Sequence, residues 1–520
     1  MDRTTLNSLA PISMALALER AAATTPARIA VICETESYSY DDLNAEVNRL
    51  TNAWLNFGAV PGEVVCSFLP KGIEFAVCFL ATQKAGLVFA SLNANAPNQL
   101  LVSQLQTLPG RFFVLPSTLK EGQLVRTITA ARPGARIITA ETRKLNDREI
   151  IRWDGILIDG SISNPPFASI DSVCYLNFTS GTTGVPKAAV GTGANIFWNT
   201  VAAIEALGLA SDDIHLSTFP SFLHPHEQLA RSIYLSGATT LIEAKVKPVW
   251  DMLLRNGVTC LMSSPSFYRL LVDYGRSVGE SPTRLRIAES GGSILPSSLA
   301  EQTNERLRAR VIPVWGSTET MGIAIAASDG ALPLSELMLG SVCPTYEAQV
   351  VDQSTFLPVA DGQPGELRIR GPGVASGYFT PIANAVNPFR DGWYYTGDIV
   401  KIDKDRNLHL SGRRGDMIKS RGLKVFPAEV ELVLRQHPSV RDVAVVGLVD
   451  NRAGEIVAAI VVLAGTETPS VRELLGLCKA KLDAHKVPRK VRYVSEIPRD
   501  DNGKIVRSRV SELLSQVVNE

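Results

Sequence analysis

Residues 175–187 read YLNFTSGTTGVPK, in which an apolar strand-like run enters a loop of glycines and small hydroxyl residues that ends at a lysine. Glycines allow backbone N–H groups to point inward as an anion nest, and the hydroxyls add further donors. The lysine supplies a positive charge for a phosphate. The stretch does not match GxxxxGK[ST], so the phosphate-loop fold of the common NTPases is not implied. We predict a different phosphate-binding loop at Thr179, Ser180, Gly181, Thr182, Thr183, Gly184 and Lys187.

On both sides of this stretch, apolar strand-like runs alternate with helix-length segments through the first four hundred residues. Such alternation predicts parallel sheets flanked by helices. Helices are expected at Asp41–Phe57, Ile73–Ala85, Glu227–Leu235 and Ser297–Arg308. Strands are expected at Val64–Leu69, Phe112–Leu115, Val173–Phe178, Thr239–Ile242, Thr259–Met262, Leu285–Ala288 and Val311–Trp315.

After about residue 340 the pattern changes to short strands separated by turns, which predicts a β-rich subdomain. From about Gly415 a smaller α+β unit follows, with a helix near Pro427–His437 and strands at Val440–Leu448 and Ile456–Leu463. A chain of 520 residues is too long for one ordinary core. At least two domains are therefore expected.

The composition restricts the class of partner. Lys plus Arg and Asp plus Glu number 52 each, so the totals give no electrostatic reason to expect nucleic acid or an anionic membrane. The seven cysteines are scattered without a CxxC pair, as expected for buried thiols in a reducing compartment. No apolar run reaches the roughly 20 residues that span a bilayer. We read the apolar run Leu9–Leu18 as an N-terminal helix, and we expect a cytoplasmic protein.

Further short motifs follow along the chain. Ser290-Gly291-Gly292-Ser293 lies between a predicted strand and a helix, and the remaining motifs read WGSTE at 315–319, GWYYTGD at 392–398, GRRGDMIKSRG at 412–422 and DNGK at 501–504. Taken alone, each is compatible with a turn or a helix cap. Together with 175–187 they resemble the adenylate-forming superfamily of acyl-CoA synthetases, nonribosomal peptide synthetase adenylation domains and luciferases, whose signature loop reads TSGTTGxPK. The resemblance covers almost the whole chain.

The resemblance implies an α/β fold in two domains. Residues 1–414 would form a large N-terminal domain of two helix-flanked sheets plus a β-rich subdomain, which binds ATP and the acid. Residues 415–520 would form a small, mobile α+β domain. Gly415 stands at the family's hinge position, often Asp or Lys, and glycine can absorb a large change in backbone angles.

The resemblance also implies roles for individual residues. The turn with Gly292 and Ser293 would line the adenine, and Trp315, where the family usually has Tyr, would stack on it. Thr318 would contact the α-phosphate and Glu319 would ligate magnesium, since a hard cation needs an oxygen anion.

Three further residues would complete the site. Asp398 would hold the ribose hydroxyls, and Arg413 would contact ribose and phosphate. Lys504, on the mobile domain, would lie between the carboxylate and ATP. A carboxylate that attacks the α-phosphorus brings two anions together, and magnesium and a lysine offset their repulsion. Lys504, Thr318 and Glu319 form the predicted catalytic set.

The acid pocket is expected between the loop after Ser217 and the segments near Pro265 and Gly291. His224 stands near the place where amino-acid-activating domains carry an Asp, which argues against an α-amino acid; Glu227 is an alternative ammonium partner. For His224 and His226, a polar turn and a substrate role are equally compatible with the sequence.

The resemblance implies ATP-dependent conversion of a carboxylic acid into an acyl adenylate with release of pyrophosphate, and then transfer to the thiol of coenzyme A or of a separate carrier protein. Transfer of the acyl group to an amine is the alternative. A non-catalytic nucleotide-binding descendant would be expected to have lost Lys504, Glu319 or Asp398, and all three are present.

Overall fold

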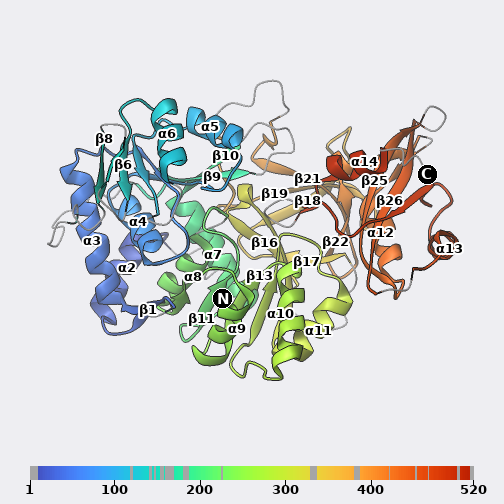
Figure 1. Cartoon of the computed structure of the whole chain (residues 1–520), viewed down its shortest axis with the longest axis horizontal. Helices are drawn as coiled ribbons and strands as arrows, with labels where there is room; N and C mark the ends of the chain where they lie inside the picture. The colour runs from blue at the N-terminus through green and yellow to red at the C-terminus, as the bar shows by residue number, and fades with distance from the viewer. Residues whose placement is uncertain are drawn as a thin grey trace.

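The computed structural model describes residues 10–34, 36–116, 121–139, 143–145, 148–152, 157, 169–179, 187–223, 226–327, 337–379, 387–420, 422–450, 454–465, 468–499 and 504–515. In this part of the chain the strands form sheets of eight, fourteen and five strands. The fold is α/β, with a large N-terminal domain and a smaller C-terminal domain at one end of the molecule, at the right in Figure 1.

The eight-stranded sheet contains the two strands that flank the predicted phosphate-binding loop. Its strand order is β10 (Lys187–Thr192), β9 (Val173–Thr179), β4 (Val88–Ser91), β3 (Val64–Ser67), β5 (Phe112–Val114), β6 (Arg136–Thr139), β8 (Arg148–Arg152) and β7 (Arg143–Leu145). The strands from β9 to β8 are parallel, and the two edge strands, β10 and β7, run antiparallel to their neighbours.

Both faces of this sheet are buried, because neighbouring residues of one strand enter different cores. Val64 and Cys66 of β3 pack with helices α5 (Asn98–Thr107) and α6 (Glu121–Ala131). Val65 points to the other face and joins the core of α2 (Met14–Thr24), α3 (Tyr40–Asn56) and α4 (Ile73–Lys84). A continuous apolar strand is the pattern that a parallel sheet covered by helices requires.

The fourteen-stranded sheet changes from parallel to antiparallel along its width. Its parallel part is β1 (Ile29–Ile32), β12 (Ala238–Thr240), β11 (Ile214–Ser217), β13 (Cys260–Ser263), β14 (Ile287–Ser290) and β15 (Arg310–Ser317), with β2 (Ser37–Ser39) antiparallel at the edge. Helices α7 (Gly193–Leu207), α8 (His226–Leu235), α9 (Val246–Arg255), α10 (Pro265–Val278) and α11 (Ser297–Leu307) surround this part.

The predicted β-rich subdomain continues this sheet rather than forming a separate one. β15 turns back through a short 3-10 helix, η2 (Thr318–Thr320), into antiparallel β16. The antiparallel part comprises β16 (Gly322–Ala326), β17 (Met338–Val342), β22 (Leu408–Arg413), β21 (Trp393–Ile402), β19 (Gly365–Arg370) and β18 (Glu347–Val351), with β20 (Phe389–Arg390) on β21. Backbone pairing across the β15–β16 turn therefore joins the two parts.

The parallel strands end at the same edge of the sheet. Ser217 ends β11 and pairs with Met262, while Ser263 and Ser290 end β13 and β14 and pair with each other. β15 continues beyond them to Ser317. The loops after parallel strands are where open α/β sheets bind ligands. The predicted turn 290–293 and the predicted motif 315–319 both lie at this edge.

The C-terminal domain is built on the five-stranded sheet, whose strands are β24 (Leu423–Val425), β23 (Ile418–Ser420), β26 (Gly454–Leu463), β25 (Val440–Asp450) and β27 (Lys490–Tyr493). Helices α12 (Pro427–Arg435) and α13 (Val471–Lys481) pack on one face. Helix α14 (Arg507–Ser515) packs on the other face. In Figure 1 this domain lies beside β21 and β22.

Most of the predicted elements are present, with ends shifted by up to three residues. The predicted N-terminal helix, Leu9–Leu18, corresponds to α2, which begins five residues later and ends six residues later. Ser13 caps α2 by accepting a bond from the Leu16 amide. Among the described residues, no helix combines the length and the hydropathy that crossing a bilayer requires.

Candidate active site

Residues 175–187 include the end of β9 and the start of β10, which pair as an antiparallel hairpin. Thr179 ends β9 and Lys187 begins β10, and the two residues are direct partners across the antiparallel pair. The loop between them contains the predicted phosphate-binding residues Ser180, Gly181, Thr182, Thr183 and Gly184, which lie outside the described residues. The structure therefore places the two ends of the loop side by side and shows what surrounds them.

Tyr378 contacts the lysine end of this hairpin. The Lys187 ammonium lies 5.8 Å from the centroid of the Tyr378 ring. The backbone around Tyr378 pairs with β10: the Val190 amide donates to the Gly377 carbonyl at 3.0 Å, and the Phe379 amide donates to the Ala188 carbonyl at 2.8 Å. Tyr378 is therefore held against the hairpin by main-chain bonds.

The same tyrosine contacts the predicted magnesium ligand. The Tyr378 hydroxyl donates to Glu319 Oε1 at 2.6 Å, and Glu319 is buried. Burial, followed by the negative charge of Glu319, raises the pKa of the Tyr378 phenol, which therefore remains a donor. Burial and the same carboxylate also raise the pKa of Tyr394. Neither tyrosine was predicted from the sequence.

Glu319 lies in a tight turn that local bonds hold in place. Ser317 accepts a bond from the Thr320 amide, and the Thr320 hydroxyl accepts one from the Ser317 amide. The Glu319 carbonyl accepts from the Ala375 amide at 2.7 Å. Thr318 opens this 3-10 turn beside Glu319 and is half-buried.

This carboxylate fits a magnesium ion that arrives with ATP. Among the described residues, no group of three or more His, Cys, Asp and Glu side chains could form a cage around a metal. Magnesium usually binds one or two carboxylates and takes its other ligands from phosphates and water. A single buried carboxylate with one oxygen bonded to a tyrosine matches that mode of binding.

The predicted adenine and ribose residues come together around one carboxylate. Trp315 Nε1 donates to Asp398 Oδ2 at 2.9 Å, and Arg413 Nε donates to Asp398 Oδ1 at 2.7 Å. Asp398 and Arg413 are also direct partners in the β21–β22 pair. The Asp398 side chain is buried, and its charge raises the pKa of Arg413. Residues 315, 398 and 413 are far apart in the sequence and form one cluster in space.

The glycine turn after β14 allows close packing. Gly292 has φ +83, and a Cβ added there would lie 3.6 Å from Cε1 of Phe219. Gly291 faces Val314 of β15, with 3.1 Å from its added Cβ to Val314 Cγ2. Ser293 follows in the same turn and is exposed. The turn therefore lies between the loop after β11 and the end of β15.

The structure describes one of the two predicted pocket histidines, His226. His224 lies outside the described residues. His226 begins α8, is buried, and its Nε2 donates to the Met321 carbonyl at 2.9 Å. Burial lowers the pKa of His226 to about 4, so it is neutral at physiological pH. This geometry gives His226 a structural role, in which it supports the end of the Glu319 turn, in place of the polar turn considered from the sequence.

Glu227 lies directly beneath the β15–β16 turn. A Cβ added at Gly322 would fall 2.0 Å from Glu227 Oε1, and the φ of +127 at this residue is a backbone conformation that favours glycine. Burial raises the pKa of Glu227 to about 8. The neighbouring Arg231 donates instead to Glu289 Oε2, at 2.6 Å. Glu227 is therefore mainly a neutral carboxyl near pH 7.

The predicted hinge lies between two anchored residues. Gly415 is the middle residue of η3 (Arg414–Asp416). Arg414 donates to Glu366 of β19 at 3.1 Å, and Asp416 Oδ2 accepts from Arg507 of α14 at 2.9 Å. The residue before Gly415 is thus tied to the large sheet, and the residue after it is tied to the C-terminal domain.

Lys504 lies in the C-terminal domain just before α14. It is exposed, and the adjacent Ile505 pairs with Arg499 in an isolated bridge. The turn residues 501–503 that precede it lie outside the described residues. Arg507, three residues later, also donates to Glu431 of α12 at 2.8 Å. The segment carrying the lysine is therefore tied to α12 and to the residue after the predicted hinge.

Two family profiles match the chain. The profile described as "AMP-binding enzyme" matches residues 18–379, and "AMP-binding enzyme C-terminal domain" matches residues 429–504. The chain belongs to the AMP-binding enzyme family. It is an AMP-forming carboxylic acid ligase, which uses ATP to convert an acid into an acyl adenylate before transfer of the acyl group.

Similar proteins of known activity cover nearly the whole chain. The indoleacetate–CoA ligase of Aromatoleum aromaticum is 27% identical over 96% of this chain and 98% of its own length. The feruloyl-CoA synthase of an Amycolatopsis species is 29% identical over 94% and 97%, respectively. The crystal structure of a benzoate CoA ligase from Burkholderia xenovorans superposes with a TM-score of 0.84, at 25% identity, over 96% of this chain and 100% of that one.

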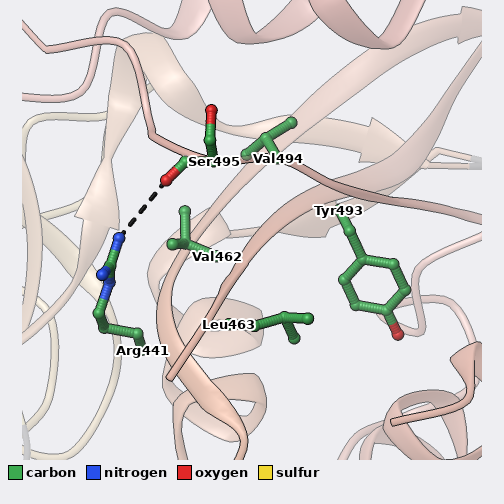
Figure 2. Close-up of a pocket in the computed structure, with 6 residues that line it drawn as sticks. All are labelled: Arg441, Val462, Leu463, Tyr493, Val494 and Ser495. Atoms are coloured by element: carbon green, nitrogen blue, oxygen red, sulfur yellow. Dashed lines mark hydrogen bonds between the residues drawn. The ribbon is translucent and has the colours of Figure 1, made fainter. Parts of the chain in front are cut away.

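The structure also contains a surface pocket in the C-terminal domain of this AMP-binding enzyme. Its volume is about 340 Å³, and Figure 2 shows Arg441 donating to the Ser495 carbonyl at 3.4 Å beside Val462, Leu463, Tyr493 and Val494. None of the predicted site residues that the structure describes lines it. The pocket is therefore separate from the cluster around Glu319 and Asp398.

Sequence reasoning missed Tyr378 and Tyr394. A signal for Tyr394 was present, since it lies inside the quoted motif 392–398. Tyr378 follows a glycine-rich segment, 371–377, that was not singled out. Only the pairing of that segment with β10 brings its ring to Lys187 and its hydroxyl to Glu319.

Proposed function

We propose that this enzyme activates an aromatic carboxylic acid as its acyl adenylate and transfers the acyl group to the thiol of coenzyme A. The main observation behind this proposal is that residues from motifs far apart in the sequence lie together in one site. Trp315 and Arg413 both donate to the buried Asp398, and Glu319 lies in the turn that follows Trp315. This arrangement supports a nucleotide whose base and ribose lie near Trp315 and whose phosphates extend toward Glu319 and Lys187.

In the first half-reaction, a carboxylate oxygen of the acid attacks the α-phosphorus of ATP. The bond from the α-phosphorus to the bridging oxygen breaks, and pyrophosphate leaves. We assign the triphosphate to the hairpin ends at Thr179 and Lys187, and the α-phosphate to Thr318. Magnesium bound at Glu319 would offset the negative charge of the phosphates. Tyr378 holds one oxygen of Glu319 and so orients the carboxylate.

We assign to Lys504 the positive charge that lies between the acid and the α-phosphate during this step. A pre-positioned cation stabilises charge that develops on the phosphoryl oxygens. The exposed position of Lys504 on the C-terminal domain fits a residue that enters the site only in one domain arrangement.

We place the domain boundary between residues 414 and 415, so that residues 1–414 bind ATP and the acid and residues 415–520 move. The ion pairs of Arg414 with Glu366 and of Asp416 with Arg507 hold the flanking residues on opposite sides of Gly415. A rotation at Gly415 would preserve both pairs. In the second half-reaction the domain withdraws Lys504, the thiolate attacks the acyl carbon, and AMP leaves.

The structure and the similar ligases support an aromatic acid without an ammonium group. Glu227, the alternative ammonium partner, is buried and mainly protonated near pH 7, and a neutral carboxyl is a poor partner for a cation. The aromatic ring of Phe219 packs against the Gly292 turn on the acid side. The similar ligases act on indoleacetate and on ferulate by name, which supports an aromatic substrate here as well.

Coenzyme A is the proposed acceptor because the similar proteins are named as CoA ligases. A carrier protein and an amine are the alternatives that an acceptor assay separates. We also propose a reducing, cytoplasmic location, because all seven cysteines are free thiols and five of them are buried.

The test is ATP–pyrophosphate exchange with a panel of aryl, fatty, α-hydroxy and amino acids. Exchange that depends on an aryl acid and falls at least about 100-fold in Lys504→Ala, with ATP binding retained, is the expected result. Full exchange in Lys504→Ala would remove the lysine from the proposed mechanism. Exchange with amino acids alone would reject the aromatic substrate.

The acceptor is tested separately by adding coenzyme A, a phosphopantetheine-bearing carrier protein or an amine after adenylation. Formation of the coenzyme A thioester is expected. A product with the amine or the carrier protein alone would replace coenzyme A with that acceptor.

A further inference from the structure

We propose that Trp315 is a positioning residue for ribose recognition: its indole N–H fixes the Asp398 carboxylate so that both carboxylate oxygens accept hydroxyls of the ATP ribose. This inference rests on the proposed function, because it assumes that adenine nucleotide binds at this cluster. The proposed role depends on the N–H group at the edge of the Trp315 indole, whereas stacking on adenine depends on the face of the ring.

The bonds at Asp398 leave a defined set of acceptors. A carboxylate has about four lone-pair positions, two on each oxygen. Trp315 Nε1 uses one position on Oδ2, and Arg413 Nε uses one on Oδ1. Within the described part of the chain, one acceptor position therefore remains on each oxygen. Two adjacent acceptors match two neighbouring hydroxyls, as on the 2′ and 3′ carbons of ribose, better than they match one.

Burial makes the two donors necessary. Asp398 is 2% exposed, and a buried carboxylate without hydrogen-bond partners is strongly destabilised. Donors on both oxygens also prevent the carboxylate from rotating about its terminal bond. Without Trp315 Nε1, Arg413 alone would hold the group, and it would do so through one oxygen.

Trp315 also joins the base site to the ribose site. Its ring is half-buried, so part of the ring surface is accessible, while its edge donates to Asp398. A nucleotide stacked on this ring would have its ribose near the carboxylate that the same ring orients. Phenylalanine would keep an aromatic face but has no N–H donor, so the two functions of Trp315 can be separated by substitution.

The experiment measures the binding of AMP, 2′-deoxy-AMP and 3′-deoxy-AMP by calorimetry to the wild type and to Trp315→Phe. Trp250→Phe is the matched control, because in the described part of the chain the buried Trp250 Nε1 has no hydrogen-bond partner. Trp315→Met replaces Trp315→Phe if the latter does not fold, since it also lacks the donor. Thermal melts report the fold of each variant.

The wild type is expected to bind AMP about 10- to 100-fold more tightly than at least one deoxy analogue, as loss of a bond to a charged acceptor implies. In Trp315→Phe this ratio should fall at least about threefold, whereas Trp250→Phe should keep it. Equal weakening of all three nucleotides, with both ratios unchanged, would overturn the inference and leave only a stacking role. A wild type that does not bind AMP would reject the proposed function itself.

Discussion

Replacing Tyr378 with phenylalanine tests the role of the hydroxyl that orients Glu319. The substitution removes one oxygen atom and keeps the ring, which packs against Phe389 with centroids 5.4 Å apart and lies 5.8 Å from the Lys187 ammonium. The change is therefore confined to the 2.6 Å bond between the Tyr378 hydroxyl and Glu319 Oε1.

The size of the effect follows from the acceptor. Glu319 is 7% exposed, and a hydrogen bond to a charged group contributes about 1.5 to 3 kcal/mol. At about 1.4 kcal/mol for each factor of ten, the loss corresponds to roughly 10- to 100-fold. We expect this loss in the kcat/KM of adenylation, together with a requirement for a higher magnesium concentration. Without the bond to Oε1, the Glu319 carboxylate can rotate, and its other oxygen is no longer held toward the magnesium ion.

The assay is ATP–pyrophosphate exchange at a series of magnesium concentrations, with the best acid from the panel. Tyr234→Phe is the matched control, since its hydroxyl donates to a neutral acceptor, the Ile12 carbonyl, at 2.8 Å. Its exchange should stay within about twofold of the wild type, because it loses a tyrosine hydrogen bond away from Glu319. An unchanged magnesium dependence in Tyr378→Phe would refute the orienting role, even if the overall rate were lower.

Two further substitutions test other parts of the structure. Burial raises the pKa of Glu227 from 4.5 to about 8, so the folded protein retains a proton that the unfolded chain releases. Between those pH values its contribution to stability falls as pH rises, and thermal melts from pH 5 to 8 should decline less steeply in Glu227→Gln; equal slopes would contradict this. Gly415→Pro should slow thioester formation more than pyrophosphate exchange, because proline restricts φ. Gly415→Ala, whose added Cβ meets nothing within 4 Å, is its control, and equal rates in the two variants would argue against a hinge.

Much of the fold follows from local patterns in the sequence. β3 reads as a continuous apolar run because both of its faces are buried, and α3, predicted at Asp41–Phe57, begins at a capping box between Ser39 and Asp42. The continuity of the fourteen-stranded sheet could not be predicted in this way. It depends on the backbone pairing of β15 with β16, which no local pattern specifies.

The roles of the motif residues were predicted from the resemblance of the motifs, taken together, to the adenylate-forming superfamily, since each motif alone is compatible with a turn or a helix cap. Their mutual arrangement was not predicted. The bond from Trp315 to Asp398 joins residues 83 positions apart, and the bond from Tyr378 to Glu319 joins residues 59 positions apart. Neither bond leaves a signal in the intervening sequence.

The sequence by itself determined the α/β class and the order of the motifs, because these depend on residue type and local spacing. The resemblance of those motifs to the adenylate-forming superfamily implied the chemistry of adenylate formation. Tertiary structure alone decided that His226 faces the Met321 carbonyl, that Glu227 is buried as a mainly neutral acid, and that one carboxylate receives both Trp315 and Arg413. The physical reason is that burial and hydrogen-bond partners set the charge and direction of a polar side chain. Both are properties of the packed chain and not of its local sequence.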